Sequence, residues 1–387
     1  MREFFCVLLQ IKRDFPKEVS QGCLVYHPFK TIMKKITFFF ICIGVLLSQC
    51  FAQKPQRVCQ ASAECGSLHA DASIPAVIVD TDLGSSTDDL IALALLYRYH
   101  RAGLCDLRGV IVDRMGDSCA VLADIMNTYY GFGHLPIGLE RGGVPNPKVY
   151  IDYCDIARYK DAKGKPLLPR MVSDITALPD GWRLYRRLLA EADDGSVAVI
   201  ALGFFSTLAQ LLESPADDIS PLTGLELVRR KVRGLYLMGA KFDEGDGTRM
   251  GYNIGKGPDF ARRCFDLWPS QVPVWFSVGS VGDTIDYDPD LVIADIGWTD
   301  RNPIKQVYMN HNCRTGQRMW DALPVIQAIE GDNQFHLSQP GTVKVLSDTE
   351  IIFIPTPTGN CRYQNQGNAD WNSLMLDKIR AAARWQP

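Results

Sequence analysis

Residues 74–103 read IPAVIVDTDLGSSTDDLIALALLYRYHRAG, and this stretch decides the fold. Its first part, 74–80, is an uninterrupted apolar run that ends in an acidic cluster. Such a run is typical of a strand buried on both faces of a parallel sheet. Its last part, 89–103, has apolar residues at helical spacing and ends at Gly103, a favourable residue just after a helix. The stretch therefore predicts a buried strand, a polar loop and a helix in succession.

The same alternation of strand and helix continues along the chain. Further strands are predicted at 107–113, 135–140, 196–203, 232–239 and 272–279, and further helices at 118–131, 182–192, 206–214 and 260–268. Repeated strand-then-helix units predict an α/β fold with a doubly wound, mostly parallel sheet and helices on both faces. Ligands bind beyond the carboxyl ends of such strands. The segment 141–180 has the weakest pattern, and we interpret it as an excursion over the sheet edge, with a lid as one option.

The composition indicates a folded globular chain. Of 387 residues, 47% are hydrophobic and 22% are charged, so disorder over most of the chain is excluded. Lys and Arg number 41 against 44 Asp and Glu, a formal charge of −3. No basic excess therefore argues for a nucleic-acid partner.

The beginning of the chain has the pattern of a secretory signal. Lys34 and Lys35 precede the apolar run 36–48, which is shorter than the roughly 20 residues of a membrane span, and Ala52 follows as a small residue at a cleavage site. We expect translation to start at Met33. Residues 1–52 are then an over-extended start plus signal peptide, 53–73 a linker, and 74–387 a single domain. The expected location is periplasmic or secreted, with no membrane contact once the leader is removed; an N-terminal anchor is the alternative.

The cysteines beyond the leader suggest mostly buried thiols. Cys59 and Cys65 lie close together in a polar stretch and could pair, since export permits disulfides. Cys105, Cys119 and Cys264 lie in apolar-patterned segments, where buried thiols are expected. No Cys or His spacing fits a structural zinc site.

The loop after the first strand carries the strongest chemical signal. Asp80, Asp82, Asp88 and Asp89 place four carboxylates within ten residues. Like charges this close raise one another's pKa unless a cation lies among them, and hard oxygen ligands favour calcium or magnesium. One alternative is that Asp88 caps the following helix while the others are solvated. Another is a magnesium-dependent phosphohydrolase of the haloacid dehalogenase type, which also has Asp-x-Asp after its first strand, although Gly84 departs from that pattern.

The loop resembles the signature of the inosine–uridine-type nucleoside N-ribohydrolases, Asp-Thr-Asp-Pro-Gly-x-Asp-Asp. Leu83 replaces the proline, and the loop is two residues longer than in the family. Later segments are similar in the same order: 202–209 to x-Gly-Pro-Leu-Thr-Asn-Leu-Ala, 237–239 to Leu-Met-Gly, 252–253 to the Phe-Asn of Glu-Phe-Asn, and 320–322 to His-Asp-Pro/Ala. The resemblance spans about 74–385. It implies calcium-dependent hydrolysis of the N-glycosidic bond of a ribonucleoside or related ribosyl compound, releasing base and ribose.

The resemblance also implies roles for individual residues. Calcium would be held by Asp82, Asp89, the main-chain carbonyl of Leu202, and Asp321. A calcium-bound water would be the nucleophile, with Asp82 as general base. The sugar oxygens would be bound by Asp88, Asn253 and Asp321, and Asp113 matches a family asparagine near the sugar. The plain structural alternatives are a solvated strand-end carboxylate at Asp113, a turn residue at Asn253 and a helix N-cap at Asp321. Family members are usually dimers or tetramers, so a homo-oligomer is implied.

The base side and the 5′ side of the site depart from the family pattern. Trp320 stands where many members have a histidine that protonates the leaving base, and a tryptophan can stack on a base but cannot supply that proton. Gly251 replaces a glutamate that holds the sugar 5′-hydroxyl. Possible substitutes at the 5′ end are Lys241, Asp246 and Arg249. The family's His-Gly segment has no match within 141–180, where Tyr150, Tyr153, Arg158 and, just beyond, Trp182 are available.

Three further interpretations follow from these departures. His311 is a candidate acid, although a lone loop histidine is more often a bystander. The extra loop residues Ser85, Ser86 and Thr87 either contact the sugar or merely widen the loop. A ribosyl-binding protein that has lost efficient catalysis is the main alternative to an enzyme.

Overall fold

The computed structural model describes residues 74–84, 86–145, 153–242, 250–311, 313 and 318–387. The residues it describes belong to one compact unit. The predicted leader and linker, including Cys59 and Cys65, lie outside the described residues. Among the helices in the described part of the chain, none combines the length and apolar character that crossing a membrane requires.

A ten-stranded sheet forms the centre of the fold, with the order β3-β2-β1-β4-β5-β6-β10-β8-β9 and β7 paired with β10. The strands are β1 (Ala76–Thr81), β2 (Asp106–Val112), β3 (Ile137–Leu139), β4 (Val197–Ala201), β5 (Val232–Met238), β6 (Val274–Ser277), β7 (His336–Leu337), β8 (Gly341–Val345), β9 (Ile351–Pro355) and β10 (Cys361–Asn365). Strands β1 to β6 pair in parallel, and β10 continues parallel to β6. Strands β8 and β9 form an antiparallel hairpin at one edge of the sheet.

Strand β1 lies where the strand order reverses, because its neighbours are β2 on one side and β4 on the other. Hydrogen bonds carry this pairing past the ends of the strands: Leu202 N donates to Asp80 O at 2.7 Å, and Asp113 N donates to Thr81 O at 3.1 Å. The segments that follow β1, β2 and β4 are thereby held side by side. This switch point is the place where open α/β sheets bind ligands.

Helices surround the sheet and continue through the C-terminal part of the chain. They are α4 (Asp88–Arg101), α5 (Asp117–Tyr129), α6 (Gly181–Glu191), α7 (Ser206–Glu213), α8 (Gly224–Lys231), α9 (Gly251–Lys256), α10 (Pro258–Leu267), α11 (Gly279–Gly282), α12 (Pro289–Asp295), α13 (Pro303–Asn310), α14 (Ala322–Glu330) and α15 (Ala369–Arg384), with 3₁₀ turns η1 (Cys154–Arg158), η2 (Ile175–Ala177) and η3 (Asp332–Gln334).

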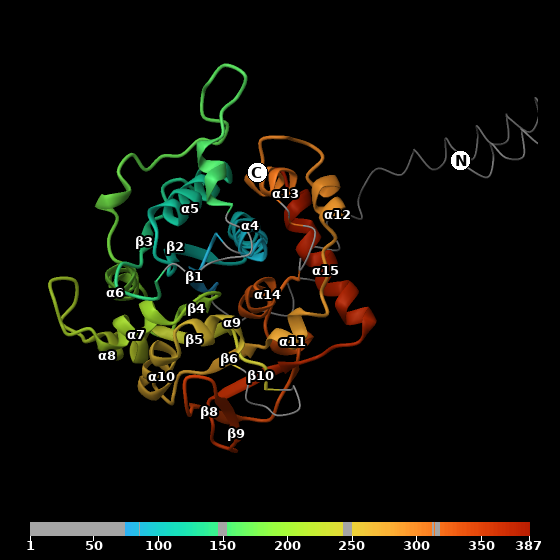
Figure 1. The fold of residues 1–387 in the computed structure, drawn as a ribbon. Helices are drawn as coiled ribbons and strands as arrows, with labels where there is room; N and C mark the ends of the chain where they lie inside the picture. The colour runs from blue at the N-terminus through green and yellow to red at the C-terminus, as the bar shows by residue number, and fades with distance from the viewer. Residues whose placement is uncertain (1–73, 85, 146–152, 243–249, 312, 314–317) are drawn as a thin grey trace, which may run out of the picture. The chain divides into compact units, whose positions relative to one another are not determined.

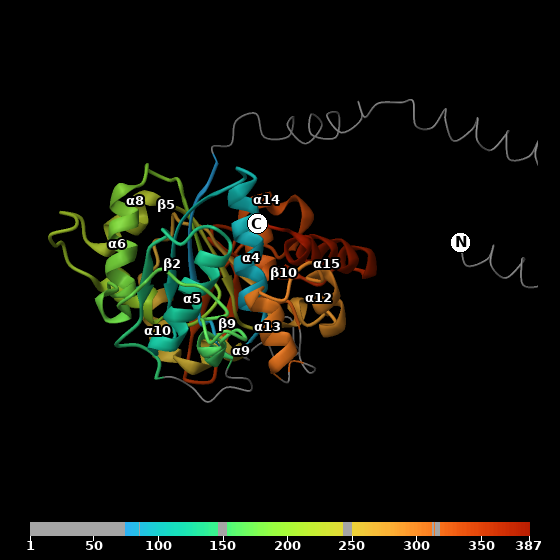
Figure 2. The ribbon, with the colours of Figure 1, turned by 90° about the horizontal axis from the view of Figure 1, so that it is seen from above.

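The helices cover both faces of the sheet, so its central strands have no access to solvent. Figure 2 shows α6, α8 and α10 on one side and α4, α14 and α15 on the other. Figure 1 shows β1 and β4 in the middle of the molecule and the β8–β9 hairpin at its periphery. Every residue of β1 and of β4 is buried, which explains why their sequences are continuous apolar runs without alternation.

The predicted fold class is confirmed. The six predicted strands are β1 to β6, and the five predicted helices are α4, α5, α6, α7 and α10. Gly103 and Gly131 follow α4 and α5 with φ of 71° and 82°, values that favour glycine. The antiparallel strands after β6 were not predicted, because they are short and half exposed and lack a long apolar run.

The segment 141–180 leaves the edge strand β3 and returns along α5. Its two 3₁₀ turns, η1 and η2, pack against that helix. Asp124 in α5 accepts hydrogen bonds from the main-chain N–H groups of Met171 and Val172, the latter at 2.7 Å. Residues 146–152 lie outside the described residues, and the lid role stays a prediction.

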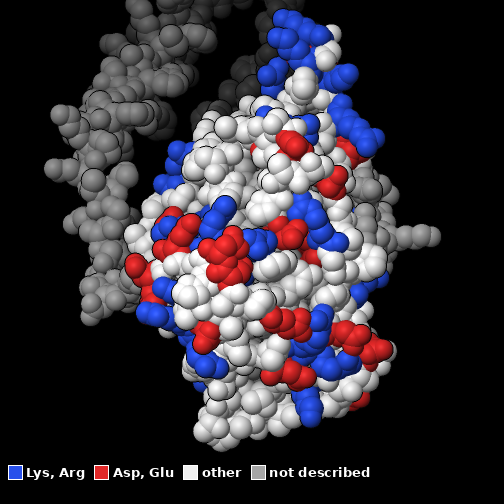
Figure 3. Space-filling model, turned by 90° about the vertical axis from the view of Figure 1, so that its left-hand side faces the viewer, with Lys and Arg blue, Asp and Glu red and all other residues white. Residues whose placement is uncertain are grey.

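The surface mixes the two signs of charge. Figure 3 shows one face, on which basic and acidic side chains are interspersed among uncharged ones. Exposed ion pairs such as Arg230 with Asp194, at 2.8 Å, and Arg183 with Asp218, at 2.9 Å, belong to this surface. Exposed pairs of this kind contribute little to stability.

Candidate functional site

The acidic loop leaves the carboxyl end of β1 and turns sharply into α4. Gly84 lies in the turn with a φ of 125°, a conformation that residues with a side chain rarely adopt. A Cβ atom at this position would lie 2.7 Å from Arg114 Nη1 and 2.8 Å from Cys154 Sγ. The loop is therefore pressed against the side chain of Arg114, which follows β2, and against that of Cys154 in η1, and the turn requires glycine.

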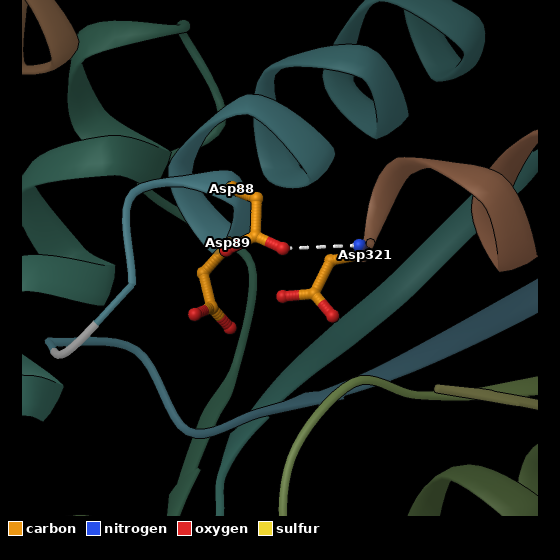
Figure 4. Close-up of side chains that lie close together, drawn as sticks. All are labelled: Asp88, Asp89 and Asp321. Carbon is orange, nitrogen blue, oxygen red and sulfur yellow. Dashed lines mark hydrogen bonds between the residues drawn. The ribbon is translucent and has the colours of Figure 1, made fainter. Parts of the chain in front are cut away.

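Three carboxylates from distant parts of the chain meet beyond this loop. Asp88 and Asp89 begin α4, and Asp321 lies at the N-cap of α14; one carboxylate oxygen from each lies within 4.8 Å of the others. Figure 4 shows the three side chains gathered between the two helix ends. Asp321 N donates to Asp88 Oδ2 at 3.2 Å, whereas the Asp321 carboxylate makes no capping bond to its own helix. The carboxylate therefore points at the other two acids instead of closing α14.

Two hydroxyl groups orient the carboxylates of this cluster. Thr81 Oγ1 donates to Asp89 Oδ1, and Ser86 Oγ donates to Asp88 Oδ1. Thr87 Oγ1 lies 3.0 Å from Tyr308 OH of α13. The extra loop residues Ser86 and Thr87 thus hold the loop and the cluster, while Ser85 lies outside the described residues.

The cluster is electrostatically unfavourable without a cation. Burial and the carboxylate of Asp88 raise the pKa of Asp82 to about 7, although the Arg114 guanidinium lowers it in part. Burial, followed by the charges of Asp82 and Asp88, raises the pKa of Asp89 well above its ordinary value. Burial and Asp88 have the same effect on the pKa of Asp321. Several acids are thus crowded in a place that water does not solvate.

The donor set fits a hard divalent cation. Asp89 Oδ2 is buried and has no hydrogen-bond partner, as expected for an oxygen that is meant for a ligand. Buried carboxylate oxygens from three side chains match the preference of calcium and magnesium for oxygen ligands. The structure therefore contains a buried acidic site that could bind a metal.

The predicted metal ligands overlap with this cluster only in part. Asp89 and Asp321 belong to it, but its third member is Asp88, which we expected to bind the sugar. Asp82 is buried next to the cluster and interacts electrostatically with Asp89 and Asp321. Leu202 O accepts a hydrogen bond from Asn253 Nδ2 at 2.6 Å. The predicted calcium carbonyl and the predicted sugar amide are thus in direct contact.

A second pair of acids lies beneath the loop. Asp80 Oδ2 accepts hydrogen bonds from Thr207 Oγ1 at 2.5 Å and from Tyr185 OH at 3.0 Å. Burial raises the pKa of Asp80 to about 7, and burial together with the charge of Asp80 raises the pKa of Asp113 well above its ordinary value. Asp113 is fully buried, so the alternative of a solvated strand-end carboxylate is wrong. A proton retained between these two acids is the simplest way for them to coexist.

Trp320 and His311 are both engaged by neighbouring groups. Trp320 Nε1 donates to Asp283 Oδ1 at 2.9 Å and to Gly279 O at 3.1 Å. His311 Nε2 lies 2.8 Å from Asp155 Oδ1 of η1. The indole N–H is thus directed at α11, and the imidazole at η1.

The other candidates are placed as follows. Lys241 Nζ lies 3.5 Å from Asp283 Oδ2, next to the Trp320 contact. Trp182 lies in α6 and is partly buried against the core. Three candidates, Tyr150, Asp246 and Arg249, lie outside the described residues.

Two residues near the site have roles that were not predicted: Arg114 was not singled out from the sequence, and Tyr153 was considered for the base side and not for holding the loop. Arg114 follows Asp113 after β2, is buried, and lowers the pKa of Asp82 and Asp89. Asp113 and Arg114 are two charged residues directly after a predicted buried strand, and this was the signal that could have revealed Arg114. Tyr153 OH accepts from Gly84 N at 3.0 Å and donates to Ser86 O at 2.5 Å, so it holds both sides of the turn. Nothing in the sequence links Tyr153 to a loop 69 positions away.

Comparison with known proteins was informative at the level of structure. The sequence matches no protein-family model and no curated protein. The inosine-uridine preferring nucleoside hydrolase from Bacillus anthracis is similar, with a TM-score of 0.60 and 16% identity over 80% of this chain and 99% of the other. The purine-preferring ribonucleoside hydrolase from Gardnerella vaginalis gives 0.56 and 13% over 80% and 99%.

A third similar structure is the type III effector protein XopQ, solved in complex with adenosine diphosphate ribose. Its TM-score is 0.57 and its identity 15%, over 86% of this chain and 100% of the other. At these identities the similarity shows the fold alone. The chain therefore has the nucleoside hydrolase fold that the resemblance predicted.

Proposed function

We propose that this protein hydrolyses the N-glycosidic bond of a ribonucleoside or a related ribosyl compound, with calcium as its cofactor. The observation that carries the proposal is the buried cluster of Asp88, Asp89 and Asp321 at the switch point of this sheet. Structures with this fold include enzymes named as nucleoside hydrolases. The cluster supplies what that reaction requires, namely oxygen ligands for a cation and anions beside a developing positive charge.

Asp82, Asp89, Leu202 and Asp321 would hold the cation, and the position of Asp88 makes it a further carboxylate within reach. A bound calcium ion would supply Lewis acidity that lowers the pKa of a coordinated water. Asp82 would accept the proton. Burial raises the pKa of this carboxyl to about 7 in the chain without a cation, and a bound cation would lower it, so that Asp82 would be ionised and able to accept the proton at neutral pH. The charge of Arg114 lowers the pKa of this carboxyl and so favours its ionised form.

The sugar would be bound by Asp88, Asn253, Asp113 and Asp321. Asn253 is 5% exposed and faces the Leu202 carbonyl, so it lies beside the proposed cation site. Both acceptors of the Trp320 N–H are protein groups, which leaves the ring as a surface on which a base can stack. The leaving base would then take its proton from water or from a group other than Trp320.

A ribosyl-binding protein without turnover is the second candidate. The observation in its favour is that the residue at the position of the leaving-group acid is a tryptophan with an engaged N–H. The similar protein XopQ was solved with adenosine diphosphate ribose, a ribosyl ligand. Such a protein would bind calcium and ligand but release no base.

The deciding experiment measures the release of reducing sugar from a panel of ribonucleosides by the full chain, with calcium and with a chelator. We expect calcium-dependent release that falls roughly 10²–10⁴-fold in Asp82→Asn, because the proton acceptor is lost. Asp290→Asn, an exposed carboxylate in the first turn of α12, is the matched control and should keep full activity. Calcium binding without release from any nucleoside would favour the binding protein. Nucleoside monophosphates assayed in parallel test the phosphohydrolase, which magnesium-dependent release of phosphate without release of sugar would favour.

We also propose that the protein is exported and assembles as a dimer or tetramer. The support is the leader pattern of residues 33–52 and the resemblance to an oligomeric family. The amino-terminal sequence of protein recovered from its native cell should begin at Gln53. Recovery from the cytosol with the leader attached would contradict export. Native mass spectrometry measures the number of subunits.

A further inference from the structure

Two cysteine thiols face each other behind the acidic loop. Cys119 lies in the first turn of α5 and Cys154 is the first residue of η1, and their Sγ atoms are 3.8 Å apart. The side chains are buried, with exposed fractions of 1% and 4%. Of the six cysteines in the described part of the chain, these two have their sulfurs in contact.

The other thiols have different surroundings. Cys313 Sγ lies 3.7 Å from Val307 O, and Cys361 Sγ lies 3.6 Å from Asn360 Oδ1. Cys264 is a fully buried residue of α10. These cysteines behave as small apolar residues, which is the usual role of a buried thiol. The pair needs a different explanation, because two neighbouring thiols can be joined as a disulfide when an oxidant is supplied.

The pair lies directly against the turn that carries the acidic residues. A Cβ atom at Gly84 would lie 2.8 Å from Cys154 Sγ and 3.3 Å from Cys119 Sγ. The residue before Cys154 is Tyr153, whose hydroxyl holds Gly84 N and Ser86 O. A bond that holds Cys154 in place would therefore also hold Tyr153, which supports the loop.

We propose that Cys119 and Cys154 form a disulfide when the chain folds under oxidising conditions, and that this bond pins η1 and Tyr153 to α5 behind the acidic loop. The two sulfurs must approach from 3.8 Å to about 2 Å, which side-chain rotation and a small shift of η1 can provide. Formation of this bond requires no hydrolytic activity.

The reaction is a thiol–disulfide exchange with a small-molecule disulfide such as oxidised glutathione. A thiolate attacks the glutathione disulfide, forming a mixed disulfide and releasing one glutathione; the second cysteine then attacks the protein sulfur and releases the other. Two S–H bonds and one S–S bond break, and one S–S bond and two glutathione S–H bonds form. Both protein thiols are oxidised and the glutathione disulfide is reduced. The exchange takes place during folding, before both sulfurs are covered.

The first test maps the cysteines of the full chain. The reduced and unfolded chain is refolded in a buffer of oxidised and reduced glutathione, quenched with N-ethylmaleimide and digested for mass spectrometry. We expect a linked pair of peptides containing Cys119 and Cys154, whereas Cys105 and Cys264 carry maleimide or remain free thiols. Maleimide or a single glutathione on Cys119 and Cys154 in the refolded protein would overturn the proposal.

The second test measures what the bond does. The closed loop spans 35 positions, so the disulfide should raise Tm by roughly 5 °C between reducing and oxidising buffers. Cys119→Ser and Cys154→Ser should each lose this gain, and Cys264→Ser, another buried thiol, should keep it. An equal gain in all three variants would contradict the assignment. The peptide map of the unaltered chain decides the matter even if a variant folds poorly.

Discussion

Two buried charged regions of this protein are built in opposite ways. Arg186 in α6 has no exposed surface, yet its donors are used: it forms two bonds to Asp217, at 2.7 and 3.1 Å, and others to Ser214 Oγ and to the carbonyls of Ser220 and Leu222. The acidic cluster instead gathers several carboxylates and leaves Asp89 Oδ2 without a partner.

The pKa values express the same contrast. The hydrogen bond from Arg186 lowers the pKa of Asp217, whereas burial raises the pKa values of Asp82 and Asp89. The charge of Arg186 finds all its partners within the chain, whereas the acidic cluster needs a cation to balance its charges. A buried charge with all its partners thus marks structure, and a buried charge without them marks a place for a ligand.

The largest expected effect comes from removing the buried guanidinium of Arg186. Arg186→Met should lower the free energy of unfolding by about 3–5 kcal/mol, because Asp217 and two carbonyls lose their buried donor. Urea unfolding followed by circular dichroism measures this loss. Arg187→Met, at the next position of the same helix and exposed, is the matched control and should change little. Equal losses in both variants would contradict the contrast.

Binding of a cation to the acidic cluster should have the next largest effect. Calcium at about 100 times its Kd should stabilise the protein by about 2.7 kcal/mol, because only the folded chain presents the cluster. Asp89→Asn should abolish this gain and should not destabilise the calcium-free protein, since it removes one buried repelling charge. Differential scanning calorimetry with calcium and with chelator checks both statements. A calcium gain that survives in Asp89→Asn would place the cation elsewhere.

The two kinds of region should also respond to pH with opposite signs. Asp80 has a pKa of about 7 in the folded chain against 3.8 when unfolded, because it is buried. Its contribution to stability is therefore complete below the unfolded value and is lost as the pH rises through about 7. In chelator, this group should lower the free energy of unfolding by about 2 kcal/mol between about pH 5 and pH 7. The decline should be shallower in Asp80→Asn; an unchanged slope would assign it to other groups.

The smallest effect is expected at Asp295, a hydrogen-bonded carboxylate at the end of α12. Burial alone would raise the pKa of Asp295, but hydrogen bonds from Arg380, Tyr287 and Arg384 hold it at about 2. This stability is present above the unfolded value of 3.8 and is lost as the pH falls through about 2. Asp295→Asn should therefore cost about 1 kcal/mol at neutral pH. Unfolding curves of the two proteins should converge near about pH 2, and a difference that persists there would exclude the ion pairs as its cause.

The parallel core could be predicted because its signal is local. Continuous apolar runs such as 74–80 and 196–203 specify buried strands without reference to distant residues. The edge hairpin of β8 and β9 was missed, since half-exposed strands depend on what they pair with. Local patterns thus reveal elements, whereas pairing at the edge is a property of the assembled sheet.

The acidic loop was predictable for the same local reason, but its partners were not. Asp321 was proposed only through family resemblance, and Arg114 was missed although it is buried near the acids. Tyr185 and Thr207 bind Asp80 across 105 and 127 positions. Such contacts follow from topology, which brings the ends of β1, β2 and β4 together; one sequence does not display them.

The meeting of Asp88 and Asp321 has a consequence for the order of events in folding. The two residues are 233 positions apart, so the acidic loop is synthesised long before α14. Until α14 docks, the carboxylates of α4 face water, and no carboxylate from the C-terminal half of the chain lies close enough to repel them. Asp321 therefore joins the charges of Asp82, Asp88 and Asp89 through a long-range contact, and contacts of this kind are slow to form. A cation present at that moment would speed the final docking step, and a chain that ends before Asp321 would assemble strands without ever assembling the centre.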